Sequence, residues 1–336
     1  ANWLGDAVMS LPALRLLRAR YPSAWIALQA MPWVADLYAG EKVADQILLY
    51  TARRGTRDWS GKWRAARRLR SNRLDTALLL TNSFDSALVV RLAGIRRRIG
   101  YSRDGRGWLL TDAIPPPRRG EIPRHERFYY LELLRRAGII ESLPPPEPVR
   151  LESAPAARPA GEEHFRQMGW AVPVIGVSPG AAYGGAKRWP PESFARAAEI
   201  VASALGGKVA VFGSMGERPT AQLLADSLAV RGVGVRNLAG ETSLSRFIEL
   251  AAACRVFLTN DSGAMHVASV LGVPTVAVFG ATDPEATGPL GPASRVIMEP
   301  ADCAPCLLRE CPTDHRCMTR VTPERVAAQA LDLLKW

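Results

Sequence analysis

The sequence predicts an α/β protein of two domains, each built on a mostly parallel sheet. Short apolar runs typical of buried strands alternate with helical segments, most clearly in the second half of the 336 residues. Prolines gather between residues 144 and 159, as they do in a linker between domains. Each side of this linker is long enough to enclose its own core, because 48% of the residues are hydrophobic.

We expect a first domain over residues 1–150, a second over 151–320 and a C-terminal helix over 321–336. The expected strands are 25–29, 46–50, 75–80, 174–178, 209–212, 235–237, 256–258 and 275–279, and the run 93–100 is expected to form a turn and then a further strand. The chain starts at Ala1 and passes through a turn at Gly5 into a helix, with no strand before it. We therefore expect that the first strand of the first domain is missing and that the chain is clipped.

Positive charge is concentrated in the first half of the chain. Residues 1–150 hold 26 Lys and Arg against 14 Asp and Glu, a net charge of +12, whereas the whole chain carries +11. Such a field suits a polyanionic partner, namely nucleic acid, an anionic membrane surface or a phosphorylated acceptor. An Arg-rich surface that only faces water is the alternative. The contiguous Arg96, Arg97 and Arg98 are candidate anion ligands.

The segment 58–73 is predicted to be a basic helix with Trp59 and Trp63 one turn apart. Such a helix can lie on a membrane interface, or it can pack on the domain with its arginines in water, and we favour packing. No stretch of the sequence approaches the ~18 consecutive apolar residues of a membrane span, and the start does not resemble a signal peptide. A cytosolic protein is therefore expected.

Residues 259–280 indicate a strand end, a polar turn, a short helix and a second strand, an arrangement that can bind phosphate. Gly263 lets a ligand approach the backbone before the helix starts at Ala264. Unpaired amides and the helix dipole favour an anion such as a diphosphate there, and His266 could add a donor. In the alternative interpretation the turn only caps the helix. The capping side chains are those of Asn260, Asp261 and Ser262.

Other loops at expected strand ends also carry candidate ligands. Lys187 and Arg188 lie in the loop after the strand at 174–178, and Glu217 follows the next strand, where a carboxylate could hold ribose hydroxyls. Open α/β sheets bind their ligands at such carboxyl ends. Taken alone, Asp6 in the turn before a helix is more often a cap than a catalyst. The Walker lysine motif, GxGxxG and GxSxG are absent, which argues against a Rossmann dehydrogenase.

In their order and spacing, these motifs resemble glycosyltransferase family 9, the bacterial lipopolysaccharide heptosyltransferases. The resemblance covers essentially the whole chain and includes a cysteine-rich tail. Its motifs are Asn2-Trp3-Leu4-Gly5-Asp6 with Ser10-Leu11-Pro12, Pro179-Gly180 with Ala186-Lys187-Arg188-Trp189-Pro190, Asn260-Asp261-Ser262-Gly263 with His266, and Phe279-Gly280-Ala281-Thr282-Asp283-Pro284.

The resemblance implies a GT-B architecture of two facing Rossmann-like domains, the first gripping the acceptor and the second the ADP-sugar. It implies inverting transfer of heptose from ADP-heptose to the inner core of lipopolysaccharide, on Kdo2-lipid A that bears heptose. It further implies that no cofactor is required and that the enzyme associates peripherally with the cytosolic face of the inner membrane. Arg96, Arg97 and Arg98 would then contribute to the acceptor site.

The resemblance also implies roles for individual residues. Asp6 matches the proposed base of the family, so a catalytic role becomes favoured over capping. Lys187 would hold the diphosphate without a metal, Glu217 would hold the ribose, and a short segment would lie near adenine. The backbone amides that share the diphosphate are those of Gly263, Ala264 and Met265. The adenine segment is Thr242, Ser243 and Leu244.

Four of the five cysteines form a cluster over residues 303–317, with His315 among them. In the cytosol such a cluster indicates a metal site more than a disulfide, but the spacing is irregular for a zinc ribbon. A structural Zn²⁺ is one possibility, and reduced thiols that pack a loop are the favoured one. The four are Cys303, Cys306, Cys311 and Cys317.

Three other functions remain as alternatives. A related core heptosyltransferase of type I or III would share these motifs. A nucleic-acid-binding protein is less favoured, because the basic residues are interleaved with few aromatics expected to be exposed. A nucleotide-sugar epimerase is less favoured because the dinucleotide glycine fingerprint is missing.

Overall fold

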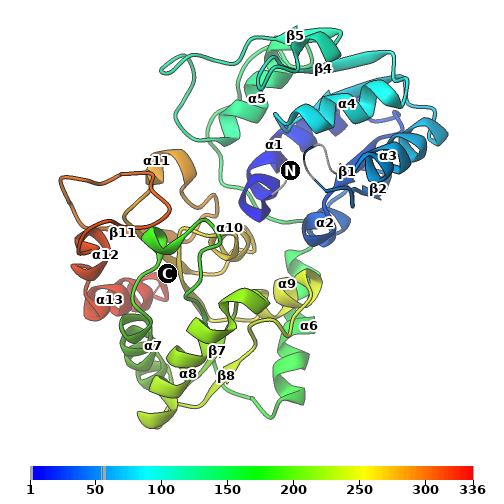
Figure 1. Cartoon of the computed structure of the whole chain (residues 1–336). Helices are drawn as coiled ribbons and strands as arrows, with labels where there is room; N and C mark the ends of the chain where they lie inside the picture. The colour runs from blue at the N-terminus through cyan, green and yellow to red at the C-terminus, as the bar shows by residue number, and fades with distance from the viewer. Residues whose placement is uncertain (1–2, 54, 56–57, 336) are drawn as a thin grey trace. The chain divides into compact units, whose positions relative to one another are not determined.

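The computed structural model describes residues 3–53, 55 and 58–335. The chain divides into two compact units, Ala1–Pro146 and Glu147–Trp336 (Figure 1). Asn2 of the opening motif lies outside the described residues. Among the helices that the structure describes, none combines the length and apolar character needed to cross a bilayer.

Unit 1 contains two small parallel sheets with helices between their strands. The first sheet pairs β1 (Ala27–Ala30) with β2 (Gln46–Leu49), and the second has the order β3 (Thr76–Leu79), β4 (Arg97–Tyr101), β5 (Asp112–Ile114). The helices are α1 (Leu4–Arg20), α2 (Pro32–Ala39), α3 (Trp59–Ser71), α4 (Phe84–Leu92) and α5 (Arg127–Arg136), with a 3₁₀ turn η1 (Gly107–Leu109).

The starts of α3 and α4 in unit 1 follow from their capping residues. Asp58 caps α3 by accepting a hydrogen bond from the Gly61 amide at 2.9 Å, and Ser83 caps α4 through the Ser86 amide at 3.3 Å. The inner faces of these two helices meet η1 in one hydrophobic core, which includes Leu69 and Leu109. The basic helix predicted over 58–73 therefore packs on the domain through one face, while its other face is exposed.

Unit 2 is built on a six-stranded parallel sheet with the order β11-β10-β9-β6-β7-β8. Its strands are β6 (Val174–Ser178), β7 (Lys208–Val211), β8 (Val235–Asn237), β9 (Val256–Asn260), β10 (Thr275–Phe279) and β11 (Ser294–Met298). The first five match the expected strands closely. Strand β11 was not predicted, because it lies at the sheet edge and only Ile297 of its five residues is buried.

Helices and short turns alternate with these strands (Figure 1). They are α6 (Ala154–Gln167), η2 (Gly185–Lys187), α7 (Pro191–Leu205), η3 (Met215–Glu217), α8 (Arg218–Val230), α9 (Leu244–Ala252), α10 (Gly263–Val270), α11 (Pro284–Thr287), α12 (Arg316–Thr319) and α13 (Pro323–Leu333). Pro155 and Pro159 belong to α6, so the linker is shorter than the proline pattern suggested. Pro155 is tolerated because the first turn of a helix leaves its amides unpaired.

The strand order places a topological switch point in the middle of the unit 2 sheet. From β6 the chain proceeds outward to β7 and β8, and it then returns to the other side of β6 with β9. All residues of β6, β9 and β10 are buried, as expected for central parallel strands covered on both faces. Ligands bind such sheets where the strand order reverses, which is here at the carboxyl ends of β6 and β9. The predicted α/β fold with mostly parallel sheets is confirmed.

Candidate active site

The turn after β9 and the start of α10 form an open helix N-terminus at this switch point. The Ser262 side chain caps α10 by accepting a hydrogen bond from the Met265 amide at 3.4 Å. Among the described residues, no protein acceptor faces the amides of Gly263 and Ala264, and both residues are half-buried. These two amides, rather than the three expected, remain for an anion at the positive end of the helix dipole. His266 is buried one turn further on.

Lys187 lies beside this helix N-terminus because Asp261 holds it there. The Lys187 Nζ atom is 2.5 Å from Asp261 Oδ2, and the two side chains are 12% and 5% exposed. The same carboxylate oxygen accepts hydrogen bonds from Thr282 at 2.6 Å and Thr287 at 3.4 Å. The Lys187 ammonium also lies 4.7 Å from the centre of the Tyr183 ring. A partly buried, oriented cation therefore lies at the helix N-terminus that carries the open amides, and this arrangement suits a diphosphate.

Asn260, at the end of β9, fixes the loop that carries Lys187. Its side-chain oxygen accepts a hydrogen bond from the Trp189 amide at 3.0 Å, and its amide group donates to the Pro179 carbonyl at 2.7 Å. Trp189 is completely buried, and its indole donates to the Val321 carbonyl at 3.1 Å. Asn260 thus joins both ends of the Lys187 loop to the central sheet.

The cysteine-rich segment lies against the other side of the same loop. Its residues Leu307, Arg309, Glu310 and His315 contact Tyr183, Gly185 and Ala186. The Glu310 carboxylate accepts a hydrogen bond from the Gly185 amide at 3.0 Å, and Arg309 offers its carbonyl to the Ala186 amide at 2.9 Å. The segment therefore supports the loop from outside the sheet.

Asp6 lies in the first turn of α1 in unit 1. Burial raises the pKa of the Asp6 carboxyl, although hydrogen bonds with the Tyr130 side chain and the Trp3 backbone favour its ionised form. Burial, and then the charge of Asp6, also raise the pKa of Glu126. Asp6 is the third residue of α1 after its N-cap residue Trp3, a position from which a side chain can reach back to the N-cap backbone. A carboxylate with a raised pKa is a better base than an ordinary aspartate.

Comparison with known proteins assigns the family. The sequence model of glycosyltransferase family 9 (heptosyltransferase) matches residues 62–316. The chain belongs to glycosyltransferase family 9. It is 34% identical to lipopolysaccharide heptosyltransferase 2 of Escherichia coli strain K12 over 302 residues, which cover 88% of this chain and 85% of the relative. It is 32% identical to lipopolysaccharide heptosyltransferase 2 of Salmonella typhimurium, covering 99% of this chain and 96% of the relative.

A solved structure supports the same assignment. The structure of E. coli ADP-heptose lps heptosyltransferase II superposes with a TM-score of 0.80 at 30% identity, covering 100% of this chain and 97% of the other. This similarity confirms the GT-B class with two Rossmann-like domains. The family resemblance seen in the sequence is likewise confirmed, and the protein is a glycosyltransferase.

Within this family 9 enzyme, the other expected donor ligands lie at neighbouring strand ends. One Glu217 oxygen accepts a hydrogen bond from the Ser214 amide at 2.7 Å, as part of a capping box. The other oxygen lies so close to Gly180 that a Cβ atom at that position would be only 2.0 Å away. Ser243 caps α9 through the Arg246 amide at 3.1 Å, with Thr242 and Leu244 on either side. Their roles in binding ribose and adenine stay predictions.

Arg96, Arg97 and Arg98 lie at the amino end of β4, whereas the expected donor ligands lie at the carboxyl ends of their strands. Arg97 begins β4 and pairs with Asp112 at 3.0 Å, while Arg98 donates to the carbonyls of Leu109 and Ile95. Among the described residues, only the Arg96 side chain of the three has no hydrogen bond or ion pair. A parallel sheet binds ligands at its carboxyl ends, so this position does not favour acceptor contact. The assignment stays a prediction.

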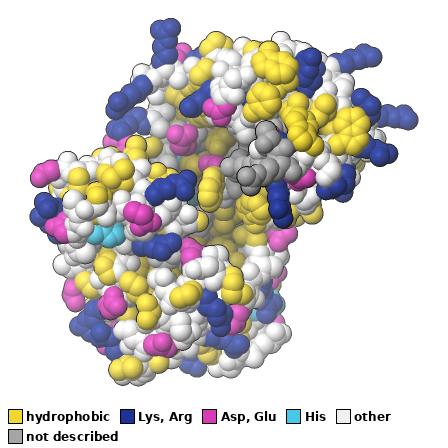
Figure 2. Space-filling view, viewed as in Figure 1, with side chains coloured by type: hydrophobic (Ala, Val, Ile, Leu, Met, Phe, Trp, Pro, Cys, Tyr) yellow, Lys and Arg dark blue, Asp and Glu magenta, His cyan; other side chains and the backbone are white. Residues whose placement is uncertain are grey.

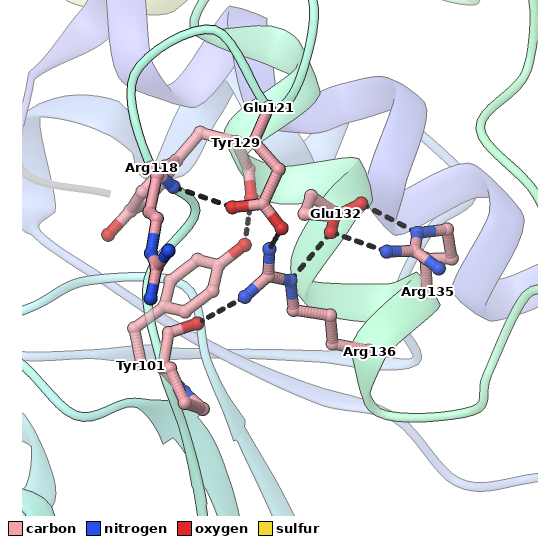
Figure 3. A network of polar contacts seen from close by, with 8 residues as sticks. Tyr101, Arg118, Glu121, Tyr129, Glu132, Arg135 and Arg136 are labelled. Atoms are coloured by element: carbon pink, nitrogen blue, oxygen red, sulfur yellow. Dashed lines mark hydrogen bonds and ion pairs between the residues drawn. The ribbon is translucent and has the colours of Figure 1, made fainter.

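A second basic group follows β5 at its carboxyl end. A cavity of about 580 Å³ is lined there by Pro115, Pro116, Arg118, Arg119, Gly120, Glu121 and Arg136. Figure 3 shows Glu121 between the Arg118 backbone amide, at 2.7 Å, and the Arg136 guanidinium. In the described chain, the guanidinium groups of Arg118 and Arg119 have no hydrogen-bond partner. These arginines were not predicted as ligands from the sequence, although they lie in a Pro-Arg-Arg-Gly stretch.

The cysteines form no disulfide among the described residues. No group of three or more His, Cys, Asp or Glu side chains in that part of the chain is arranged to hold a metal ion. Burial, and then the neighbouring Cys303, Cys311 and Cys306, raise the pKa of the Cys317 thiol. Cys317 is buried and packs against Gly280. The choice between thiols that pack a loop and a structural Zn²⁺ stays a prediction.

Several residues of the site were not assigned a role from the sequence. Thr282 was quoted only as part of a motif, yet its hydroxyl orients Asp261. Asn260 was expected to cap α10, but it holds the Lys187 loop instead. Glu126 and Tyr130 lie near Asp6 and carried no sequence signal beyond their own identity.

Proposed function

We propose that this protein transfers L-glycero-D-manno-heptose from ADP-heptose, with inversion, to the inner core of lipopolysaccharide, adding heptose II onto heptose I. The observation that carries the proposal is the pair of Lys187 and Asp261 beside the open N-terminus of α10. Similarity to type 2 enzymes over 85% or more of their length supports the choice of acceptor position.

The donor half of the reaction requires positive charge at the departing ADP. The Lys187 ammonium and the amides of Gly263 and Ala264 would bind the diphosphate, and they stabilise the negative charge that develops as the bond from C1 to the phosphate oxygen breaks. Asp261 and Thr282 keep Lys187 in place before the donor arrives, so little reorganisation is needed. These groups supply the required charge, and we propose that no cofactor is needed.

The acceptor half requires a base. The Asp6 carboxylate would take the proton of the acceptor hydroxyl as its oxygen attacks C1 of the heptose, and ADP leaves from the opposite face. Burial raises the pKa of Asp6 and so strengthens it as a base. Transfer with inversion needs a single carboxylate for this step.

We further propose that unit 1 binds Kdo2-lipid A that bears heptose, and that the enzyme acts peripherally at the cytosolic face of the inner membrane. The net charge of +12 over residues 1–150 supports a phosphorylated acceptor. The acceptor ligands would include Arg96, Arg97 and Arg98 as first expected, and the group at Arg118 and Arg119 competes with them for this role. No nucleic acid partner is proposed.

Mass spectrometry of the products tests the function. The enzyme is incubated with ADP-heptose and two defined core acceptors, one with heptose I and one without it. A mass increase of one heptose only on the first acceptor is expected. Transfer to the acceptor without heptose would indicate a type I enzyme, and release of free heptose or an altered ADP-sugar without transfer would contradict the proposal.

A further inference from the structure

The tryptophans of unit 1 are unusually exposed. Trp3, Trp25, Trp33, Trp59, Trp63 and Trp108 are each between 52% and 66% exposed, whereas Trp189 of unit 2 is completely buried. Tryptophan is highly buried in most folded proteins, and contiguous apolar patches mark interaction sites. The sequence-based expectation of few exposed aromatics in the basic half was therefore wrong.

Three of these tryptophans belong to one surface, which we call the aromatic–basic patch. The rings of Phe84 and Trp108 are 6.1 Å apart, and the Arg91 guanidinium lies 5.7 Å from the centre of the Trp108 ring. A buried ion pair of 2.6 Å between Lys62 and Asp85 joins α3 to α4. The patch consists of Trp59, Trp63 and Arg67 on α3, Phe84 and Arg91 on α4, and Trp108 on η1.

The helix geometry explains why these side chains face outward together. Ala66 and Leu69 of α3 pack in the core with Val89 and Leu109. Trp59, Trp63 and Arg67 recur every four residues, so they form one stripe along the outer face of α3. Figure 2 shows hydrophobic side chains gathered over the part of unit 1 where Figure 1 draws α3 and α4, with Lys and Arg around them.

The charge of the patch matches an anionic membrane surface. Helix α3 exposes four arginines and contains no Asp or Glu, while its Lys62 is buried against Asp85. Tryptophan rings beside arginines are typical of helices that lie in the headgroup region of a bilayer. We propose that the aromatic–basic patch docks unit 1 on a bilayer containing anionic phospholipid, with its aromatic rings among the headgroups and its arginines against the phosphates. This deepens the proposed function, because it rests on a lipid-linked acceptor.

The position of the patch in the fold fits that role. Trp59 is the first residue of α3, after β2, and Phe84 is the first residue of α4, after β3. Trp108 lies between β4 and β5, four residues before β5 begins. The patch thus begins at the carboxyl ends of β2 and β3, the edge where α/β sheets bind their ligands, and extends from there along the outer faces of α3 and α4. Docking through it would bring a lipid-borne acceptor to that edge.

Vesicle co-sedimentation tests the proposal with the intact protein. The vesicles contain phosphatidylcholine alone or with phosphatidylglycerol, and no lipopolysaccharide, so binding is measured independently of transfer. One variant carries Trp59→Ala, Trp63→Ala and Trp108→Ala, and a second carries Arg67→Gln and Arg91→Gln. Trp25→Ala is the matched control, because Trp25 is 61% exposed but lies before β1 and does not belong to the patch.

The protein and the Trp25→Ala control are expected to bind the anionic vesicles, with weaker binding to phosphatidylcholine. Each patch variant should lose roughly tenfold or more in partition coefficient, since each interfacial cation contributes about 1 kcal/mol and buried aromatic area adds to it. The arginine variant retains every tryptophan, so it tests the patch even if the tryptophan variant folds poorly.

Three outcomes would overturn the proposal. The patch variants could bind vesicles as well as the unaltered protein does. The substitutions could instead abolish concentration-dependent self-association, or binding of a single-stranded oligonucleotide, and leave vesicle binding unchanged. Transfer to a water-soluble core acceptor is measured separately. If the unaltered protein does not transfer heptose to this acceptor, the proposed function is contradicted. Vesicle binding that depends on the patch would still support docking.

Discussion

At the residue scale, the proposed donor site contains a lysine that is already paired. Lys187 Nζ lies 2.5 Å from Asp261, whose oxygen also receives the Thr282 and Thr287 hydroxyls. A diphosphate adds its negative charge to a cation whose position is fixed, so binding costs little side-chain entropy. The lysine would orient the donor and neutralise the leaving group at once.

Lys187→Ala should weaken ADP binding by about 1.5–3 kcal/mol, or roughly 10- to 100-fold in Kd, because a charge-assisted contact is lost. Lys187→Arg should restore part of it. Calorimetric titration with ADP measures the effect, and Lys335→Ala, at an exposed lysine of the same unit, is the control. Melting temperatures show whether the now unpaired Asp261 destabilises the fold. Unchanged ADP affinity in a folded Lys187→Ala protein would place the diphosphate elsewhere.

Asp6→Asn should reduce transfer by roughly 10²- to 10⁴-fold while ADP affinity stays the same, because the amide cannot accept the proton of the acceptor hydroxyl. Asn caps a helix as well as Asp does, so loss of capping would not explain the effect. Initial rates at saturating ADP-heptose measure it. Near-normal transfer would reduce Asp6 to a capping role.

The raised pKa of Asp6 also predicts a stability difference with a definite sign. Burial raises the pKa of this carboxyl in the folded state, so its ionisation disfavours folding. The stability it contributes when protonated is present below its unfolded pKa and is lost as the pH rises through the folded pKa. Asp6→Asn should therefore melt higher than the unaltered protein at pH 7, and the difference should vanish near pH 3. If Asp6→Asn instead melts at a lower temperature than the unaltered protein at pH 7, the folded protein stabilises the ionised Asp6 carboxylate.

At the element scale, the cysteine-rich segment acts as a support for the Lys187 loop. Leu307, Arg309, Glu310 and His315 each contact that loop by a hydrogen bond. The loop itself contains Gly184, where a Cβ would lie 2.2 Å from the Arg309 carbonyl, so only glycine permits this approach. We therefore expect the cysteine-rich segment to affect donor binding through the position of the Lys187 loop.

Glu310→Ala should raise KM for ADP-heptose several-fold with little change in kcat, because the Gly185 amide loses its acceptor and the loop becomes less ordered. A hydrogen bond of this kind contributes about 1 kcal/mol, or roughly fivefold. Asp314→Ala is the matched control, since Asp314 pairs with Arg316 inside the segment and does not contact the loop. Equal KM values for the two variants would show that Glu310 does not support the Lys187 loop in donor binding.

At the scale of the whole molecule, charge divides the chain between its units. Residues 1–150 carry +12 while the entire chain carries +11, so the remainder is nearly neutral. The proposed polyanionic acceptor would therefore be attracted to unit 1 over distances of about a Debye length, roughly 10 Å at 0.1 M salt. The KM for the acceptor should increase with salt for this reason.

Two arginine groups can be compared as the source of this dependence. Replacing Arg96, Arg97 and Arg98 with Gln tests the group expected from the sequence, and replacing Arg118 and Arg119 tests the group at the carboxyl end of β5. Substitution of the group that contacts the acceptor should raise the KM for the acceptor about tenfold or more. It should also make this KM less dependent on salt, because exposed charge pairs weaken with ionic strength. If neither set of substitutions changes KM or its slope, both assignments fail.

The sequence by itself determined the secondary structure and the motifs of this protein. Strands β6, β8 and β10 match the expected ranges, because buried parallel strands show as short apolar runs between helices. The helix start at Gly263 was one residue from the expected Ala264, since capping side chains act locally. Edge strand β11 escaped notice because a half-exposed strand lacks that apolar signature.

Only the tertiary structure decided which of these residues meet. Strand order places β6 beside β9, so Lys187 reaches Asp261 across 74 residues of sequence. Contacts between distant residues also pair Arg97 with Asp112. Asn260, which was expected to cap a helix, instead accepts a hydrogen bond from Trp189 and holds the Lys187 loop. Sheet order and side-chain pairing depend on contacts between distant segments, and periodicity and capping patterns describe only neighbours along the chain.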